Sequence, residues 1–216
     1  MTAMTAMTPR PIRLCFFGDS FVAGVGDPTH RGWVGLLAER AGQALGETDF
    51  TVYNLGVRRD TTADVRARWF DEVRHRFPDG CDNRLVFSFG VNDTTRQADS
   101  TRVRPEDSVA NLAEILDEAR ANSWPVLVVG PPPIADGEQN ARTAHLDGLF
   151  AAVCAHRNVP YRSVFGPLDG DTAWMREAAA GDGAHPAAQG YRDLANIVLD
   201  AWSTWIGSAV VVGEGR

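Results

Sequence analysis

The chain has 216 residues, a formal net charge of −7, and 44% hydrophobic and 23% charged residues, a balance that fits one globular domain with a sizeable core. The acidic balance argues against a protein that binds nucleic acid or anionic membranes, because both partners require a basic face. All 21 positive residues are arginine, and the lack of lysine excludes Schiff-base, pyridoxal-phosphate, Ser–Lys and P-loop chemistry.

Short apolar runs alternate with amphipathic segments, which predicts a parallel sheet covered by helices on both faces. Five strands are expected, at residues 12–17, 50–55, 84–89, 125–130 and 159–163. Helical spacing is clearest at Val65, Trp69, Val73 and Phe77, and again from Val109 to Ala119. A last helix is expected from Pro186 to about Gly207. The predicted fold is an α/β three-layer sandwich with a five-stranded parallel sheet, flavodoxin-like in topology.

The domain is expected to span residues 12–207, between two short ends. Residues 1–11 contain no apolar run of the secretory type and are interpreted as a flexible leader. Residues 208–216 are interpreted as a C-terminal tail. No later stretch is long and apolar enough for an integral membrane segment, so the expected location is cytoplasmic.

In such a sheet, ligands bind beyond the carboxyl ends of the strands, so the residues after each strand are the candidates for a site. Ser20, in Gly18-Asp19-Ser20-Phe21 after the first strand, is either a nucleophile or only a cap of the next helix. Gly56, in Asn54-Leu55-Gly56, either forms a turn or directs its N–H toward an oxyanion. Asn92, in Gly90-Val91-Asn92-Asp93, is either a turn residue or an amide donor.

Asp182 and His185 come just before the last helix. The positive end of a helix disfavours imidazolium, and a neighbouring carboxylate orients the ring, so this pair suits a general base. An ordinary loop histidine is the alternative. The other histidines compare poorly: His75, His145 and His156 are expected on helix surfaces, and His30 is only a weak rival base.

Cysteine and arginine patterns point to no further chemistry. Three cysteines are far apart without metal-ligand spacing, and Cys15 and Cys154 are expected in the core. The pairs Arg58/Arg59 and Arg66/Arg68 are interleaved with acidic residues and are interpreted as solvated helix faces.

The blocks GDS, Gly, GxND and DxxH occur in the order found in the SGNH hydrolase superfamily, also called GDSL-like lipases and esterases, which this sequence resembles from residue 12 to about 206. The resemblance implies a nucleophile at Ser20, a triad completed by Asp182 and His185, and an oxyanion hole formed by Ser20, Gly56 and Asn92. Phe21 stands where the family has its name-giving leucine, a departure expected to affect packing or pocket shape only.

The implied reaction is acyl transfer from a small-molecule carboxylic ester to Ser20, then hydrolysis, with no metal or organic cofactor. An O-acyltransferase or a thioesterase would use the same residues. A nucleotide-binding module is disfavoured, because Gly24-Val25-Gly26 lacks the third glycine of a dinucleotide fingerprint. A non-catalytic relative is disfavoured because all the expected polar groups are present. The sequence leaves the substrate and the oligomeric state open.

Overall fold

Five parallel strands form the central sheet in the order β2-β1-β3-β6-β7. The computed structural model of the protein describes residues 10–170 and 172–211, with side chains as far as residue 207. The strands are β1 (Ile12–Gly18), β2 (Phe50–Gly56), β3 (Asp82–Ser88), β6 (Val126–Val129) and β7 (Tyr161–Arg162). A separate antiparallel hairpin of β4 (Arg96–Gln97) and β5 (Ser100–Thr101) follows β3. The strand order is that of a flavodoxin-like sheet, as predicted.

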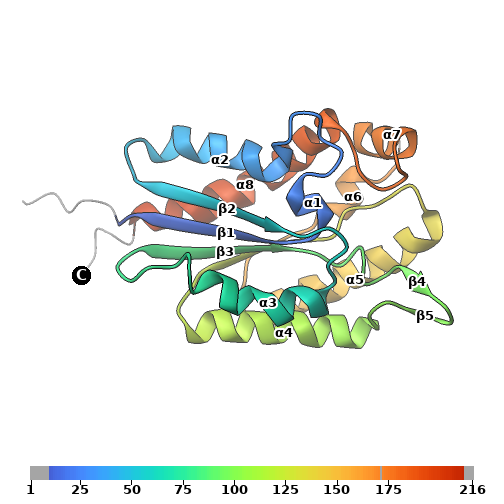
Figure 1. Cartoon of the computed structure of the whole chain (residues 1–216), viewed down its shortest axis with the longest axis horizontal. Helices are drawn as coiled ribbons and strands as arrows, with labels where there is room; N and C mark the ends of the chain where they lie inside the picture. The colour runs from blue at the N-terminus through green and yellow to red at the C-terminus, as the bar shows by residue number, and fades with distance from the viewer. Residues whose placement is uncertain (1–9, 171, 212–216) are drawn as a thin grey trace, which may run out of the picture.

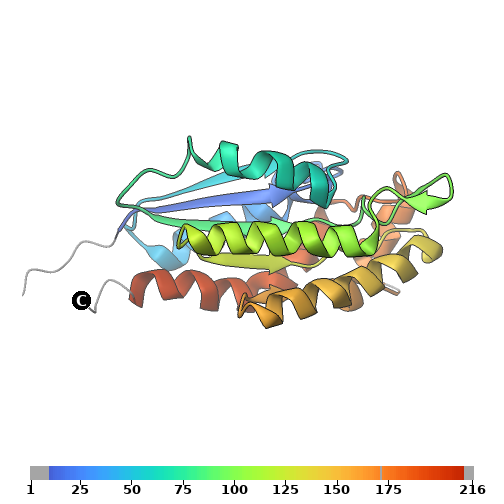
Figure 2. The same ribbon diagram turned by 90° about the horizontal axis from the view of Figure 1, so that it is seen from below.

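Helices cover both faces of the sheet and make three layers (Figures 1 and 2). On one face lie α2 (Gly32–Leu45) and α8 (Ala188–Val211), and on the other lie α3 (Thr62–Val73), α4 (Pro105–Ala121) and α5 (Gly137–His156). Three short helices, α1 (Ser20–Ala23), α6 (Phe165–Leu168) and α7 (Ala173–Ala180), lie toward the end of the molecule where the strands terminate.

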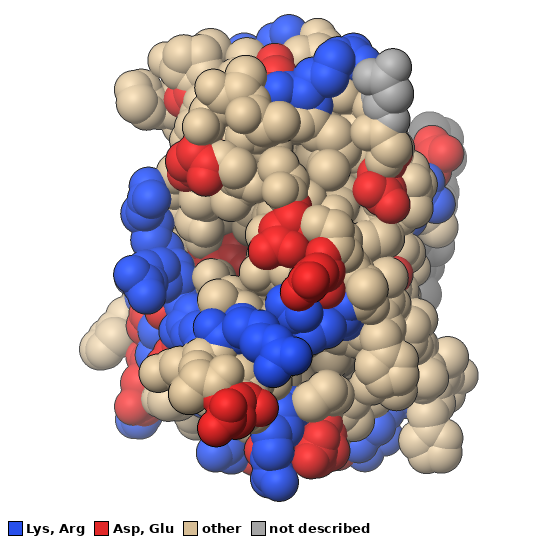
Figure 3. All heavy atoms as spheres, turned by 90° about the vertical axis from the view of Figure 1, so that its right-hand side faces the viewer, with Lys and Arg blue, Asp and Glu red and all other residues tan. Residues whose placement is uncertain are grey.

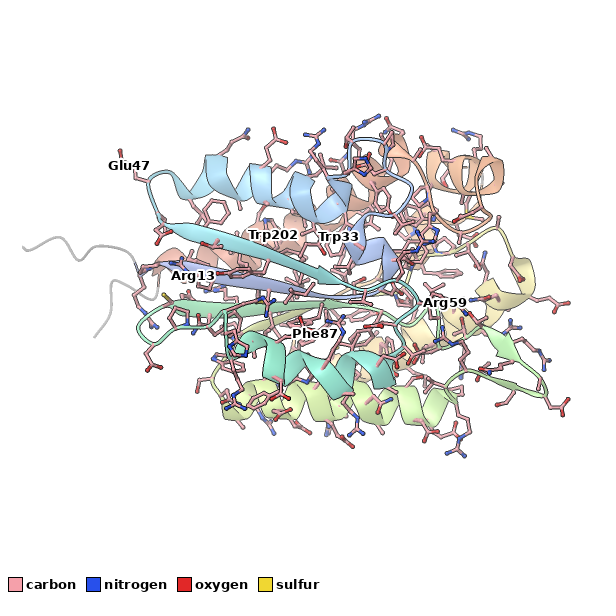
Figure 4. All side chains as sticks on the ribbon, in the orientation of Figure 1. Arg13, Trp33, Glu47, Arg59, Phe87 and Trp202 are labelled. Carbon is pink, nitrogen blue, oxygen red and sulfur yellow. The ribbon has the colours of Figure 1, made fainter. Side chains whose placement is uncertain are left out.

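The strands separate two hydrophobic clusters, because successive side chains of a strand point to opposite faces. In β1, Leu14 and Phe16 pack toward α2 and α8, whereas Cys15 and Phe17 pack toward α3 and α4. Figure 4 shows the same division, with Trp33 and Trp202 on one side of the sheet and Phe87 on the other. The apolar runs of the sequence are therefore strands buried on both faces.

Several predicted boundaries differ from the structure. The helix containing Val65 ends at Val73, so Phe77 lies beyond it, and the last helix begins at Ala188 and runs past Gly207 to Val211. The hairpin and the short helices α1, α6 and α7 had no counterpart in the prediction, because two to eight residues carry too little periodicity to detect.

Residues 1–9 of the predicted leader and 212–216 of the predicted tail lie outside the described residues. Within the described part of the chain, no helix has both the length and the apolarity needed to cross a membrane.

Candidate active site

Ser20 lies at a tight connection between β1 and α1. Asp19 caps this helix, accepting a hydrogen bond from the N–H of Phe21 at 3.0 Å, and Ser20 is the first helical residue. The interpretation of Ser20 as a cap is therefore wrong, since Asp19 has that role. Only glycine fits at position 18, because a Cβ there would lie 1.8 Å from the carbonyl oxygen of Ser88. Strands β1 and β3 therefore lie close together at Gly18, and Ser20 follows two residues later, at the carboxyl end of the sheet.

Ser20, His185 and Asp182 form a continuous chain of hydrogen bonds. Ser20 Oγ lies 2.8 Å from His185 Nε2, and His185 Nδ1 lies 2.7 Å from Asp182 Oδ2. Burial acts to raise the pKa of Asp182, but the backbone N–H groups of His185 and Ala184 and the imidazole itself outweigh it and bring the pKa to about 2. An ionised carboxylate can only accept, so Nδ1 carries the proton and Nε2 presents its lone pair to the Ser20 hydroxyl.

The ring of His185 is held by apolar contacts as well. The Phe21 ring lies 5.0 Å from the His185 ring and 5.8 Å from that of Trp174, between the centroids. On another side, a Cβ at Gly26 would lie 3.1 Å from His185 Cβ, and the Tyr191 hydroxyl donates to the carbonyl of Val25 at 2.7 Å. Phe21, the residue that departs from the family leucine, therefore packs against the candidate base.

The first amides of α8 are paired with a side chain other than His185. Glu177 of α7 accepts hydrogen bonds from the N–H groups of Ala187, Gln189 and Gly190 at 2.9, 3.3 and 2.7 Å. A carboxylate therefore satisfies the first amides of the helix and offsets its dipole. The helix dipole therefore acts more weakly on His185 than the sequence predicts, whereas the predicted partner Asp182 lies where expected.

The two other predicted residues lie beside Ser20. A Cβ at Gly56 would lie 2.3 Å from the N of Ala23 and 2.8 Å from the carbonyl oxygen of Asp19, so only glycine lets β2 approach α1 here. The Gly56 N–H donates to Asn54 Oδ1 at 3.1 Å. The Asn92 amide nitrogen donates to Asp19 Oδ2 at 3.2 Å and to the carbonyl of Asp60 at 3.0 Å. Gly56 and Asn92 thus both come to the strand end that carries Ser20.

Arg68 of α3 joins the strand ends on which these groups lie. Its guanidinium donates to the carbonyls of Leu55 and Gly18 at 2.8 and 3.3 Å, and it pairs with Asp60 and Glu72 at 2.7 Å each. Only 21% of its side chain is exposed. The interpretation of Arg68 as part of a solvated helix face is therefore wrong. The structural role of Arg68 could not be predicted from the sequence, because the carbonyls that it contacts belong to strands distant from it in the sequence.

Asp93, the last residue of the GxND block, is fully buried and joins two helices. It accepts from the N–H of Thr62 at 3.0 Å and from Ser108 Oγ at 2.7 Å. Burial raises the pKa of Asp93, while the Thr62 and Ser108 hydroxyls oppose the rise. These bonds fasten the N-terminal ends of α3 and α4 to the loop that carries Asn92.

Most of the remaining candidates behave as the sequence predicts. His75, His145 and His156 are exposed, although His75 lies in a turn beyond the end of α3 and not on a helix. Cys15 and Cys154 are buried, and burial raises the pKa of both thiols to about 12. Among residues 10–170 and 172–211, no group of three or more His, Cys, Asp or Glu side chains is placed to hold a metal ion.

Comparison with known proteins identifies the family of the chain. The model of the GDSL-like Lipase/Acylhydrolase family matches residues 16–192. The chain belongs to this family. Esterase TesA of Pseudomonas aeruginosa is 29% identical over 177 residues, which make up 81% of this chain and 79% of that protein. The family assignment confirms the resemblance to SGNH hydrolases and makes the chain an ester-hydrolysing enzyme.

Solved structures agree with the family fold. The crystal structure of TesA matches with a TM-score of 0.72 at 26% identity, covering 89% of this chain and 99% of that one. Axe2, an acetylxylan esterase from Geobacillus stearothermophilus, matches with a TM-score of 0.73 at 20% identity, covering 91% of this chain and 96% of that one. The three-layer fold predicted from the sequence is thus the fold of these relatives.

Proposed function

We propose that this family member is a serine esterase that hydrolyses carboxylic esters of a small or acyl-chain substrate through an acyl-enzyme on Ser20. The observation that carries the proposal is the chain of hydrogen bonds from Ser20 Oγ through the His185 ring to Asp182, at 2.8 and 2.7 Å. These contacts support the assignment of Ser20 as nucleophile, His185 as base and Asp182 as the carboxylate that orients the ring.

Each proton in the proposed reaction passes through His185. Ser20 Oγ attacks the ester carbonyl carbon and gives its proton to Nε2. The imidazolium then protonates the leaving alcohol as the C–O bond breaks, which leaves the acyl group on Ser20. A water molecule next attacks the acyl carbon and gives a proton to Nε2, and this proton returns to Ser20 Oγ as the carboxylic acid departs. Asp182 stays ionised and holds the ring in the tautomer that both steps need.

The negative charge that develops on the carbonyl oxygen requires donors. We assign this role to the N–H groups of Ser20 and Gly56 and to the amide of Asn92, which lie at the same strand end. Gly56 now donates to the neutral amide oxygen of Asn54 at 3.1 Å, and an oxyanion is the stronger acceptor because it is charged. The Asn92 amide nitrogen would share its protons between the oxyanion and its present partners, the Asp19 carboxylate and the Asp60 carbonyl.

The proposal is tested by hydrolysis of p-nitrophenyl acetate. Ser20→Ala is expected to lower turnover by about 10⁴-fold or more, because the nucleophile is lost, while the urea midpoint stays near that of the wild type. Ser203→Ala, at an exposed serine of α8, is the matched control and should keep full activity. A fluorophosphonate is expected to label Ser20, as located by peptide mapping. Undiminished turnover in Ser20→Ala would reject the proposal.

A thioesterase or an O-acyltransferase would share these residues and differ only in leaving group or acceptor. A panel of acetyl, longer acyl, thioester and lysophospholipid substrates, assayed with and without an added alcohol acceptor, separates these activities. The esterase assignment requires the oxygen esters to have the highest kcat/KM and water to remain the main acceptor.

A further inference from the structure

The turn Val57–Asp60 is bonded to two segments of the candidate site. It is closed by a hydrogen bond from the N–H of Asp60 to the carbonyl of Val57 at 3.2 Å. Its first residue is bound to β1 through the Val57 N–H and the Gly18 carbonyl at 3.0 Å, and its last accepts from Asn92. The turn therefore lies between the strand end that leads to Ser20 and the amide of Asn92.

The two central residues of this turn are Arg58 and Arg59, and both are exposed. They belong to no helix, so their interpretation as a solvated helix face is wrong. Arg59 has a φ of +71°, the conformation that the third residue of a type II turn requires and that glycine usually supplies. An arginine at this position costs stability, and glycine would form the same turn without that cost. The arginine therefore indicates that the guanidinium side chain has a role of its own.

Within the described residues, neither Arg58 nor Arg59 has a carboxylate at ion-pair distance. Arg66 and Arg68 on the following helix, by contrast, pair with Glu114, Asp60 and Glu72. Figure 3 looks onto the end of the molecule where the strands terminate, and a band of arginine crosses the middle of that face. Figure 4 places Arg59 at this same end of the sheet.

Two further observations describe the surroundings of the pair. Burial raises the pKa of the Tyr191 hydroxyl, and the charge of Arg58 acts in the opposite direction, so this guanidinium lies within electrostatic reach of a residue that supports the loop packed on His185. Beside the arginines, Val57 is 45% exposed, which is unusual among the large apolar residues described. The turn thus offers an apolar contact together with two cations.

We propose that the Arg58–Arg59 turn binds an anionic group of the substrate, a carboxylate or a phosphate, so that the enzyme prefers esters carrying such a group over neutral esters of the same shape. The guanidinium fork matches both groups. An overall charge of −7 repels anions, and Asp182 adds negative charge at His185, so a local positive element is needed to hold an anion near Ser20. The inference rests on the proposed esterase function and names its substrate class.

The test compares matched esters. The neutral member is methyl 4-acetoxybenzoate, and the anionic members are 4-acetoxybenzoate and 4-acetoxyphenyl phosphate, which separate carboxylate from phosphate. A second pair carries the charge on the acyl side, as the 4-nitrophenyl monoester of glutaric acid against 4-nitrophenyl pentanoate. The measured quantity is the anionic-to-neutral ratio of kcat/KM. Comparing this ratio between variants cancels the intrinsic reactivity of each ester.

Arg58→Gln and Arg59→Gly are each expected to lower the ratio by about fivefold in at least one pair, and the double variant by more, because each removes one exposed ion pair with the substrate. Arg59→Gly also relieves the turn and should not lower the melting temperature, which excludes misfolding as the cause. Added salt should lower the wild-type ratio. Arg74→Gln, at the opposite end of α3, is the matched control and should leave the ratio unchanged.

Ratios in the double variant equal to the wild type, in both pairs, overturn the inference, as does an equal fall in Arg74→Gln. A binding measurement separates this failure from failure of the esterase function. In Ser20→Ala, calorimetric titration with the anionic and the neutral ester of each pair is expected to show tighter binding of the anion in at least one pair, lost on adding Arg58→Gln and Arg59→Gly. Equal binding of the anionic and neutral esters in both pairs rejects the anion site whatever the outcome of the hydrolysis assay.

Discussion

Asp19 links the helix that carries Ser20 to the amide of Asn92. One carboxylate oxygen accepts from the N–H of Phe21 at 3.0 Å and the other from Asn92 at 3.2 Å. The residue is only 1% exposed, and burial raises its pKa to about 7, with the Phe21 N–H opposing the rise. A single buried carboxylate thus orients both the helix that carries Ser20 and the amide of Asn92, the proposed oxyanion donor.

The raised pKa predicts a pH-dependent stability. An unfolded aspartate titrates near 4, so between about pH 4 and pH 7 the folded protein holds a proton on Asp19 that the unfolded chain has released. Stability contributed by Asp19 therefore falls as pH rises through this window. Asp19→Asn keeps a good helix cap and removes the titration. Urea unfolding at pH 4 and pH 8 should show the variant gaining stability over the wild type at pH 8 only.

The same substitution tests the orientation of Asn92. An asparagine amide at position 19 faces the Asn92 amide as a donor, so Asn92 loses its anionic partner. Turnover on p-nitrophenyl acetate is expected to fall by about tenfold, the usual effect of losing a hydrogen bond to a charged group, with a much smaller change in KM. If the stability of Asp19→Asn changed with pH in the same way as that of the wild type, and turnover were unchanged, Asp19 would not have this role.

At the scale of elements, α3 stabilises the site through Arg68. Arg68→Met keeps most of the apolar stem but leaves the carbonyls of Gly18 and Leu55 and the Asp60 carboxylate without this donor. We expect a loss of about 2 kcal/mol of unfolding free energy and a lower kcat, because the Val57–Asp60 turn loses one of the contacts that fix it. Urea titration and steady-state kinetics measure the two effects.

Arg66→Met is the matched control on the same helix. Its partner Glu114 is largely exposed, and such surface pairs contribute about 0–1 kcal/mol. The control should change neither stability nor kcat appreciably. Equal effects of the two substitutions would show that α3 tolerates the loss of any arginine and that Arg68 has no special role.

At the scale of the whole molecule, the first strand and two distant helices meet at Phe16. Its ring lies 5.7 Å from that of Trp33 on α2 and 5.5 Å from that of Trp202 on α8, and all three are buried. Phe16→Ala is expected to cost about 3–5 kcal/mol, a large share of the roughly 5–15 kcal/mol that stabilises a domain. Phe16→Leu should cost less, and urea unfolding followed by tryptophan fluorescence measures both.

Local patterns in the sequence were sufficient for the fold class, and together with the family resemblance they selected the candidate site residues. The alternation of apolar strands and amphipathic helices predicts a parallel sheet, and a parallel sheet brings the residues after its strands to one edge. Ser20, Gly56, Asn92 and the pair Asp182 and His185 were therefore found without coordinates. Their chemical roles remain proposals that rest on the geometry described above.

The sequence by itself thus determined the layers, the strands and which side chains gather at the strand ends. Tertiary structure alone decided what holds them there: Asp19 against Asn92, Arg68 across two strand ends, and Glu177 rather than His185 at the start of α8. It also placed Arg58 and Arg59 on a turn beside the site. The reason is physical, since periodicity and turn chemistry act over a few residues, whereas these contacts join segments that become neighbours only after the strands have paired.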